Sequence, residues 1–146
     1  MQPIEIFYID DDADDVEIFT EAVKTIEDTI PSKITLITFF EGEVFLKTIK
    51  KKLPQNGIIF LDINMPVKNG FQVLTEIRAN ENLKNIPVIM YSTSSNGLSV
   101  DKSYELGANL YAIKPRSFEV LKDIIKKVLD VNWQDFIRNK SDFIIQ

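Results

Sequence analysis

The sequence predicts an α/β domain in which a five-stranded parallel sheet carries helices on both faces. Two observations support this fold class. Short apolar runs alternate five times with segments whose apolar residues recur every three or four positions, which is the pattern of repeated strand–helix units. The run Ile58–Leu61 is apolar throughout, as is typical of a parallel strand covered on both faces. Right-handed crossovers between such strands bring all their C-terminal ends to one edge of the sheet.

The chain before Ile58–Leu61 contains two strand–helix units. The run Ile34–Phe40 is less uniformly apolar than the others, which indicates an edge strand. Pro54 ends the second helix, because proline cannot continue a helix. The elements expected here are a strand at Ile4–Ile9, a helix with Val16, Phe19, Val23 and Ile26 at helical spacing, a strand at Ile34–Phe40, and a helix marked by Phe45, Ile49 and Leu53.

The second half supplies the remaining units. Pro87 opens the fourth strand. Gly107 is the expected C-cap of the helix before the fifth strand, because glycine adopts the left-handed backbone that often ends a helix. The elements expected here are strands at Ile58–Leu61, Val88–Tyr91 and Leu110–Ile113, helices at Phe71–Ala79 (with Leu74 and Ile77 inward) and Leu98–Leu106, and a last helix defined by Phe118, Leu121, Ile125 and Val128.

The composition excludes several classes of function. The 146 residues contain neither histidine nor cysteine, which excludes histidine-based catalysis, metals ligated by these residues, and a phosphohistidine carrier. The formal net charge of −5 disfavours nucleic-acid binding, and no apolar run approaches the ~20 residues of a membrane span. Because no signal-peptide pattern opens the chain, we expect a cytoplasmic single domain with no nucleic-acid or membrane partner.

Polar residues gather at the predicted C-terminal ends of four strands. Asp10–Asp12 follow the first strand, and Asp62 follows the third. Ser92 and Thr93 follow the fourth, and Lys114 follows the fifth. Close carboxylates repel one another, and a cation relieves that repulsion. An all-oxygen ligand set favours Mg²⁺, with Mn²⁺ as the alternative. An aspartate beside a metal ion, a lysine and a hydroxyl suits phosphoryl transfer to the aspartate.

The order of these residues resembles the receiver domain of two-component response regulators. The resemblance covers about residues 3–132 and implies a flavodoxin-like fold with strand order 2-1-3-4-5. The segment 103–109 looks especially like single-domain receivers of the phytochrome-associated type. The matching motifs are Ile9–Asp12, Asp62–Pro66 with Asn69–Gly70, Pro87–Thr93, Gly107–Ala108 and Lys114–Pro115.

The resemblance implies a role for individual residues of these motifs. Asp62 would accept a phosphoryl group from a partner's phosphohistidine, and Lys114 would contact a phosphoryl oxygen. Ser92 would hydrogen-bond the phosphoryl group and pull its loop inward, while Tyr111 would change rotamer as that loop moves. The Lys114–Pro115 peptide bond would be cis. The implied magnesium ligands are Asp11 directly, Asp10 largely through water, Asp62, and the backbone carbonyl of Asn64.

Two of these assignments leave alternatives open. Three consecutive aspartates leave the metal-binding register open by one position. We assign Asp10 and Asp11, which directly follow the strand, and expect Asp12 to help cap the next helix. Ser92 and Thr93 compete for the switch hydroxyl, and Ser92 is favoured because it comes first after the apolar run.

The resulting functional prediction is a stand-alone response regulator, which accepts a phosphoryl group and is not a turnover enzyme. The implied partners are a sensor histidine kinase or phosphotransfer protein, with a phytochrome-type kinase as one candidate. A downstream protein would bind the surface of the fourth helix, fifth strand and fifth helix. One alternative is a magnesium-dependent phosphatase with an aspartate nucleophile, but Asn64 stands where such enzymes need a second acid. The other is a degenerate receiver used only for dimerisation, which the intact acidic set and Lys114 argue against.

The expected organisation is a receiver domain over residues 1–132 and a C-terminal extension over residues 133–146. An output domain that binds DNA would need a further ~60 residues and a basic helix, so none is expected. The extension contains Trp133, Phe136 and Phe143 and is too apolar for a simple disordered terminus. It would pack either on its own domain or on a second copy of the chain, which makes a homodimer one candidate assembly.

Overall fold

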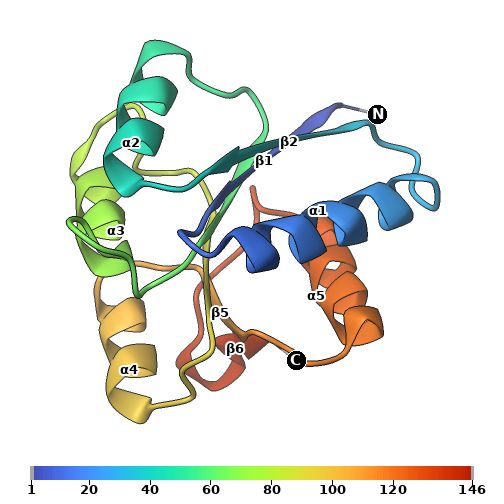
Figure 1. Cartoon of the computed structure of the whole chain (residues 1–146). Helices are drawn as coiled ribbons and strands as arrows, with labels where there is room; N and C mark the ends of the chain where they lie inside the picture. Colours follow the sequence, from blue (N-terminus) through green and yellow to red (C-terminus); the bar gives the residue numbers. More distant parts are fainter. Residues whose placement is uncertain (1, 146) are drawn as a thin grey trace.

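A parallel sheet forms the centre of the computed structural model, which describes residues 2–145 (Figure 1). Within these residues the sheet has six strands in the order β2-β1-β3-β4-β5-β6. The predicted fold class and the order of the first five strands are therefore confirmed. The first five strands are β1 (Ile4–Ile9), β2 (Ile34–Phe39), β3 (Gly57–Leu61), β4 (Val88–Ser92) and β5 (Leu110–Ile113).

Five α-helices in the described part of the chain cover the two faces of this sheet (Figure 1). Helices α1 and α5 pack on one face, and α2, α3 and α4 pack on the other. Because both faces are covered, the inner strands β1, β3 and β4 bury almost every side chain, which explains their apolar sequences. The helices are α1 (Ala13–Glu27), α2 (Gly42–Lys51), α3 (Gly70–Ala79), α4 (Gly97–Glu105) and α5 (Phe118–Asp130).

Side-chain caps fix where the helices that follow β1 and β3 begin. The Asp12 carboxylate accepts hydrogen bonds from the backbone N–H groups of Asp14 (2.9 Å) and Asp15 (3.1 Å), which confirms Asp12 as the cap of α1. Asn69 and Gln72 form a reciprocal capping box at the start of α3. These caps hold the ends of the loops that follow β1 and β3.

Three boundaries or orientations predicted from the sequence were wrong. Helix α2 ends at Lys51 and leaves Leu53 45% exposed, because a residue that precedes proline is disfavoured in the helical conformation. Phe118 is the first residue of α5 and is 39% exposed, so it does not belong to the inward stripe of that helix. Phe40 lies beyond the end of β2 and is 51% exposed.

The C-terminal segment, defined here as residues 133–145, supplies the sixth strand. It contains a 3-10 helix at Lys140–Asp142 and the strand β6 at Ile144–Ile145, which pairs in parallel with β5. The prediction of five strands was one short, because a two-residue strand is too short to show an alternating pattern. Trp133 and Phe136 of the segment pack against the core between the sheet and the α1–α5 layer.

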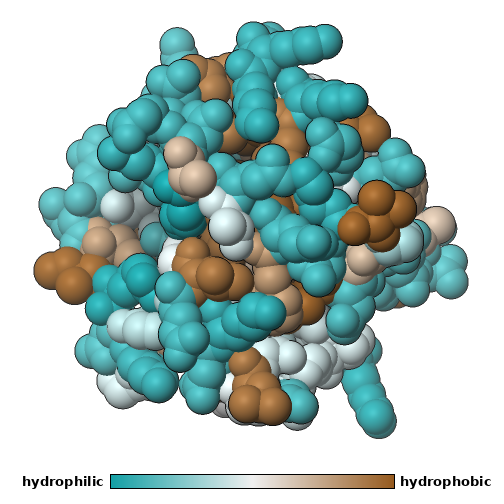
Figure 2. All heavy atoms as spheres, turned by 90° about the vertical axis from the view of Figure 1, so that its left-hand side faces the viewer, coloured by the Kyte–Doolittle hydropathy of each residue, from teal (hydrophilic) through white to brown (hydrophobic). Residues whose placement is uncertain are grey.

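The surface formed by α2, α3 and α4 is largely hydrophilic (Figure 2). Its hydrophobic side chains lie in separate spots and form no continuous patch in this view. Single exposed apolar side chains are normal for a folded domain, so this face gives no sign of a large apolar interface. None of the helices between residues 2 and 145 combines the length and apolar character that crossing a membrane requires.

Candidate functional site

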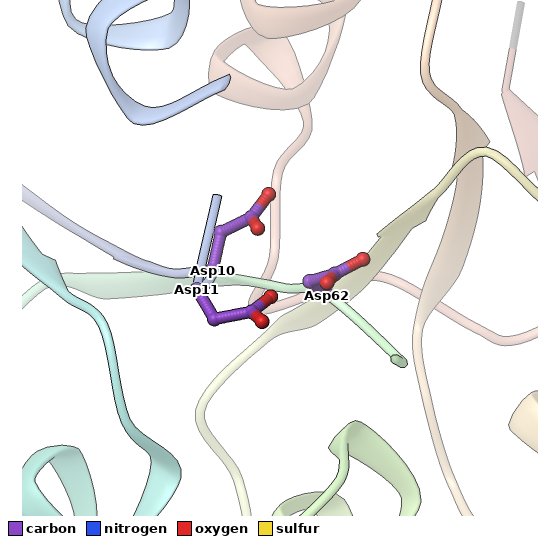
Figure 3. A group of neighbouring side chains, drawn as sticks. All are labelled: Asp10, Asp11 and Asp62. Carbon is purple, nitrogen blue, oxygen red and sulfur yellow. The ribbon is translucent and has the colours of Figure 1, made fainter. Parts of the chain in front are cut away.

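The carboxyl ends of the central strands carry the polar residues that the sequence analysis selected. Asp10 and Asp11 directly follow β1, and Asp62 directly follows β3, its neighbour in the sheet. The three side chains lie side by side at this edge (Figure 3). Each offers a carboxylate oxygen, and these oxygens all lie within 4.8 Å of one another. The fold therefore brings the three acids together, as the topology predicted.

Burial makes this cluster electrostatically unfavourable when no cation is present. Asp10 is fully buried and Asp62 is 5% exposed, whereas Asp11 faces solvent. Burial, followed by the negative charge of Asp10, raises the pKa of Asp62 from its ordinary 3.8 to about 6. A buried carboxylate held next to a second one gains from any cation that can reach both, so the arrangement favours metal binding.

Lys114 supplies the one positive charge that the structure places in this cluster among the described residues. Its Nζ lies 2.7 Å from Asp10 Oδ2, 2.8 Å from Asp15 Oδ2 and 3.5 Å from Asp62 Oδ1. Burial alone would lower the pKa of Lys114, but the hydrogen bonds to Asp10 and Asp15 outweigh it and raise that pKa above its ordinary value. The lysine therefore remains charged and is shared among three carboxylates, with the longest contact to Asp62.

Two residues around Asp10 were missed by the sequence analysis. Tyr8 donates a short hydrogen bond from its hydroxyl to Asp10 Oδ2. Burial, with Asp10 as the next cause, raises the pKa of the Tyr8 phenol, so Tyr8 acts only as a neutral donor. Asp15 lies in the first turn of α1 and pairs with Lys114. The position of Asp15 among the acidic residues that follow β1 could have indicated a role in the site. An acidic residue is, however, also common in the first turn of a helix, where it interacts favourably with the helix dipole.

The loop from β3 to α3 holds Asp62 in place through a close backbone approach. Gly70 N–H donates to the Ile63 carbonyl at 2.8 Å. A Cβ at position 70 would lie 2.2 Å from the Asp62 carbonyl oxygen, so only glycine fits there. Asn64 is exposed in this loop, two residues after Asp62.

The end of β4 distinguishes the two candidate hydroxyls. Ser92 is the last residue of β4 and is fully buried, whereas Thr93 is exposed in the loop that follows. Ser92 Oγ accepts a 3.2 Å hydrogen bond from Ser94 N–H, and the Tyr111 hydroxyl donates to the Ser94 carbonyl at 2.6 Å. Ser92 and Tyr111 thus contact the same short loop between β4 and α4. Through these contacts β5 is connected to the end of β4.

The Lys114–Pro115 peptide bond is trans, so the expectation of a cis bond was wrong. The trans form of an X–Pro bond is intrinsically favoured by about 0.5–1 kcal/mol. In this conformation Lys114 N–H still donates to the Ser92 carbonyl at 2.8 Å, and its ammonium still contacts Asp10. The position of the lysine therefore does not require the cis isomer.

Comparison with known proteins gives the family of this chain. Residues 6–126 match the model of the response regulator receiver domain. The response regulator Rcp1 of Synechocystis sp. is 34% identical over 131 residues, which cover 86% of this chain and 84% of Rcp1. The chemotaxis protein CheY1 of Helicobacter pylori is 35% identical over 85 residues, 56% of this chain and 68% of CheY1.

Solved structures give the same result. The Mn²⁺-bound form of response regulator Rcp1 superposes with a TM-score of 0.75 at 30% identity, covering 92% of this chain and 97% of that one. The phosphorylated cyanobacterial phytochrome response regulator RcpA has a TM-score of 0.75 at 29% identity, covering 91% and 95% of the two chains. Domains of this type act in signalling, with histidine kinases and downstream effectors as partners, and not as classical enzymes. This chain belongs to the response regulator receiver domain family.

Proposed function

We propose that this protein is a phosphorylation-controlled switch in a two-component phosphorelay, with Asp62 as the phosphoacceptor. The observation that carries the proposal is the position of Asp62, whose carboxylate ends a buried strand beside Asp10 and Asp11 and within 3.5 Å of Lys114. Asp62 has a weaker contact to Lys114 than Asp10 or Asp15 has. Because Lys114 holds Asp62 less closely, a carboxylate oxygen of Asp62 is the atom of the cluster best placed to attack a phosphoryl group.

The proposed reaction transfers a phosphoryl group from a phosphohistidine of a kinase or phosphotransfer protein. An Asp62 oxygen forms a bond to phosphorus, while the phosphorus–nitrogen bond breaks and its electron pair stays on the departing imidazole. Positioning and neutralisation of charge supply most of the catalysis in such a transfer. Lys114 supplies a fixed positive charge within reach of both Asp62 and its neighbours. The exchange with a kinase or phosphotransfer protein would take place in the cytoplasm.

The acidic cluster fits a hard divalent cation. Receiver domains bind Mg²⁺ or Mn²⁺ at an acidic site, and Asp10, Asp11 and Asp62 present oxygen atoms close enough to share one ion. Burial, followed by the charge of Asp10, raises the pKa of Asp62 despite the nearby Lys114, so a further cation would favour its ionised form. We propose these three residues and the Asn64 carbonyl as the ligands of Mg²⁺, which when bound would neutralise charge on the transferring group.

We propose Ser92 and Tyr111 as the residues that report phosphorylation. Ser92 ends a strand next to β3, and its hydroxyl would donate to a phosphoryl oxygen on Asp62. Ser92 Oγ already contacts the Ser94 N–H, and Tyr111 binds the carbonyl of the same residue. A shift of Ser92 toward a phosphoryl group would therefore move the partner of Tyr111. This response is a change of state and not a chemical turnover.

We propose that residues 1–132 are the signalling unit and that residues 133–146 extend it. A downstream protein would bind over α4, β5 and α5, and β6 with the rest of the C-terminal segment forms part of this surface because it covers the edge of β5. A phytochrome-type sensor kinase is the proposed upstream partner, by analogy with the phytochrome response regulator RcpA. A second copy of the chain is a further candidate partner for this face.

The phosphoacceptor is tested with acetyl phosphate and Mg²⁺, which replace the kinase. Wild-type protein is expected to gain one phosphoryl group by intact mass, and hydroxylamine should remove it because it cleaves acyl phosphates. Asp62→Asn should gain none. Asp123→Asn, which changes an exposed aspartate on α5, should be labelled like wild type. Equal labelling of the Asp62→Asn variant would rule out Asp62 as the acceptor.

The metal ligands are tested by thermal or urea unfolding with and without Mg²⁺. At a hundredfold excess over its dissociation constant, Mg²⁺ is expected to raise the free energy of unfolding by about 2.7 kcal/mol. Asp11→Asn should remove most of this gain but leave the metal-free protein folded, because Asp11 is exposed and has no buried partner to lose. If the melting temperature of the wild type is the same with and without Mg²⁺, the proposed metal site is wrong.

A further inference from the structure

The C-terminal segment is attached to the domain directly beside the residue proposed as the switch. Tyr111 N–H donates to the Phe143 carbonyl at 2.9 Å, and the paired positions are Tyr111 with Ile144 and Ala112 with Ile145. The backbone of Tyr111 therefore takes part in the pairing of β5 with β6. No other strand in the described chain pairs with this edge of β5.

Phe143 anchors the C-terminal segment next to this strand pair. It is only 2% exposed and packs in the core on the α4 side of the sheet. Its ring lies edge-on to Tyr104 of α4, with 5.1 Å between ring centroids, and 6.3 Å from the ring of Tyr111. Arg138 strengthens the attachment, because its guanidinium lies 4.1 Å from the Tyr104 ring centroid and donates to the Tyr104 carbonyl.

The two contacts of Tyr111 lie on opposite sides of β5. Its hydroxyl reaches the Ser94 carbonyl in the loop after β4, on one side of the strand. Phe143 precedes β6, which lies on the other side. The Phe143 ring is therefore the neighbour of the Tyr111 ring on the β6 side, with 6.3 Å between their centroids. Tyr111 is fully buried.

We propose that Phe143 is a positioning residue, through which the docked C-terminal segment holds Tyr111 against the β4–α4 loop. The Tyr111 hydroxyl already binds Ser94 in this loop. A phosphoryl group that draws Ser92 and its loop inward and a segment that keeps Tyr111 on that loop would favour the same loop position, so each would favour the other. Phosphorylation of Asp62 would tighten docking of the segment, and docking would raise the affinity of the site for a phosphoryl group. This inference rests on the proposed role of Asp62.

Two features of the segment would allow such coupling to shift its docking. In the described part of the chain, strand β6 has two residues. Within the segment, Trp133 Nε1 and Arg138 Nε are buried without a hydrogen-bond partner. Unpartnered buried donors disfavour the docked state, so Phe143 and the Tyr104 contacts must offset them. An equilibrium between docked and undocked segment with a small free-energy difference can respond to an event at a distant site.

The first measurement is hydrogen exchange of the protein over residues 1–146, read by mass spectrometry. Beryllofluoride with Mg²⁺ serves as the probe, because it mimics a phosphoryl group on an aspartate. Adding it should slow exchange of peptides that contain Tyr111 and residues 141–145 by about fivefold or more. Asp62→Asn should show no such change. Unchanged or faster exchange in wild type that binds beryllofluoride would overturn the coupling.

The second measurement is the affinity for beryllofluoride, obtained by titration calorimetry. Phe143→Ala should weaken binding by about fivefold or more. Phe143→Leu should restore most of it, because leucine refills the apolar site. Ile137→Ala is the matched control in the same segment, since Ile137 is 85% exposed, and it should bind like wild type. In a Tyr111→Phe background, which lacks the hydroxyl bond to Ser94, Phe143→Ala should have little further effect.

The outcomes separate this inference from the proposed function. If wild type and Phe143→Ala bind beryllofluoride with equal affinity, the positioning role is wrong while the role of Asp62 stands. The same conclusion follows if Phe143→Ala weakens binding equally with and without the Tyr111 hydroxyl, because the effect would then be general destabilisation. If wild type takes up neither acetyl phosphate nor beryllofluoride, both proposals are overturned.

Discussion

Lys114→Met is expected to destabilise the metal-free protein by about 3–5 kcal/mol near pH 8. Its side chain is 10% exposed and pairs with Asp10 and Asp62, whose side chains are 0% and 8% exposed. Methionine keeps most of the apolar stem but removes the charge, which leaves buried carboxylates without a cation. Removing one partner of a buried ion pair lowers the free energy of unfolding by far more than the intact pair adds to it, because the other charge stays buried without a partner.

The measurement is urea unfolding in the presence of a chelator, with Lys24→Met as the matched control. Lys24 pairs with Glu21 on α1, where the two side chains are 67% and 60% exposed, and an exposed pair contributes at most about 1 kcal/mol. Excess Mg²⁺ should recover part of the loss at position 114, because it returns positive charge to the same cluster. A loss that is equal for the two variants would mean that Lys114 is an ordinary surface lysine.

Asp62→Asn is expected to do the opposite and stabilise the metal-free protein above pH 6, by about 2–3 kcal/mol. Burial, followed by Asp10, raises the pKa of Asp62 from 3.8 to about 6 in the folded state. Between these two values the folded state binds more protons than the unfolded state does. Stability therefore falls as the pH rises through this window, and the deficit remains at higher pH. Asparagine keeps the shape and carries no charge.

The difference between variant and wild type should therefore be small at pH 4 and grow until about pH 6 to 7. Urea unfolding as a function of pH in a chelator measures it. Asp123→Asn removes an equal charge from an exposed position and should change stability by less than about 0.5 kcal/mol at any pH in this range. A stabilisation that does not depend on pH would refute the raised pKa of Asp62 as its cause.

The parts of this fold that follow from local sequence were predictable. The inner strands are apolar because two layers of helices cover them, and the alternation of strands and helices was enough to bring Asp10, Asp62 and Lys114 to one edge. The choice between Asp12 and its neighbours was also predictable, because a capping aspartate stands directly before a helix.

The features that depend on contacts between distant segments were not predictable. Asp15 looks like any acid in a first helical turn until Lys114 is placed beside it. Strand β6 pairs with β5 next to Phe143, whose ring contacts Tyr104 and Tyr111. Two isoleucines alone do not indicate a strand. The cis bond expected at Lys114–Pro115 came from resemblance alone, and the conformation of this chain does not follow it.

The short sixth strand also limits how the edge of the sheet could pair with a strand of another chain. A strand at the edge of a sheet exposes unpaired backbone groups that can template another chain. Without β6, the four-residue β5 would be such an edge. With it, the outermost strand on that side is two residues long and leaves too little unpaired backbone for a partner strand to extend the sheet. The C-terminal segment thus protects the domain against edge-to-edge aggregation.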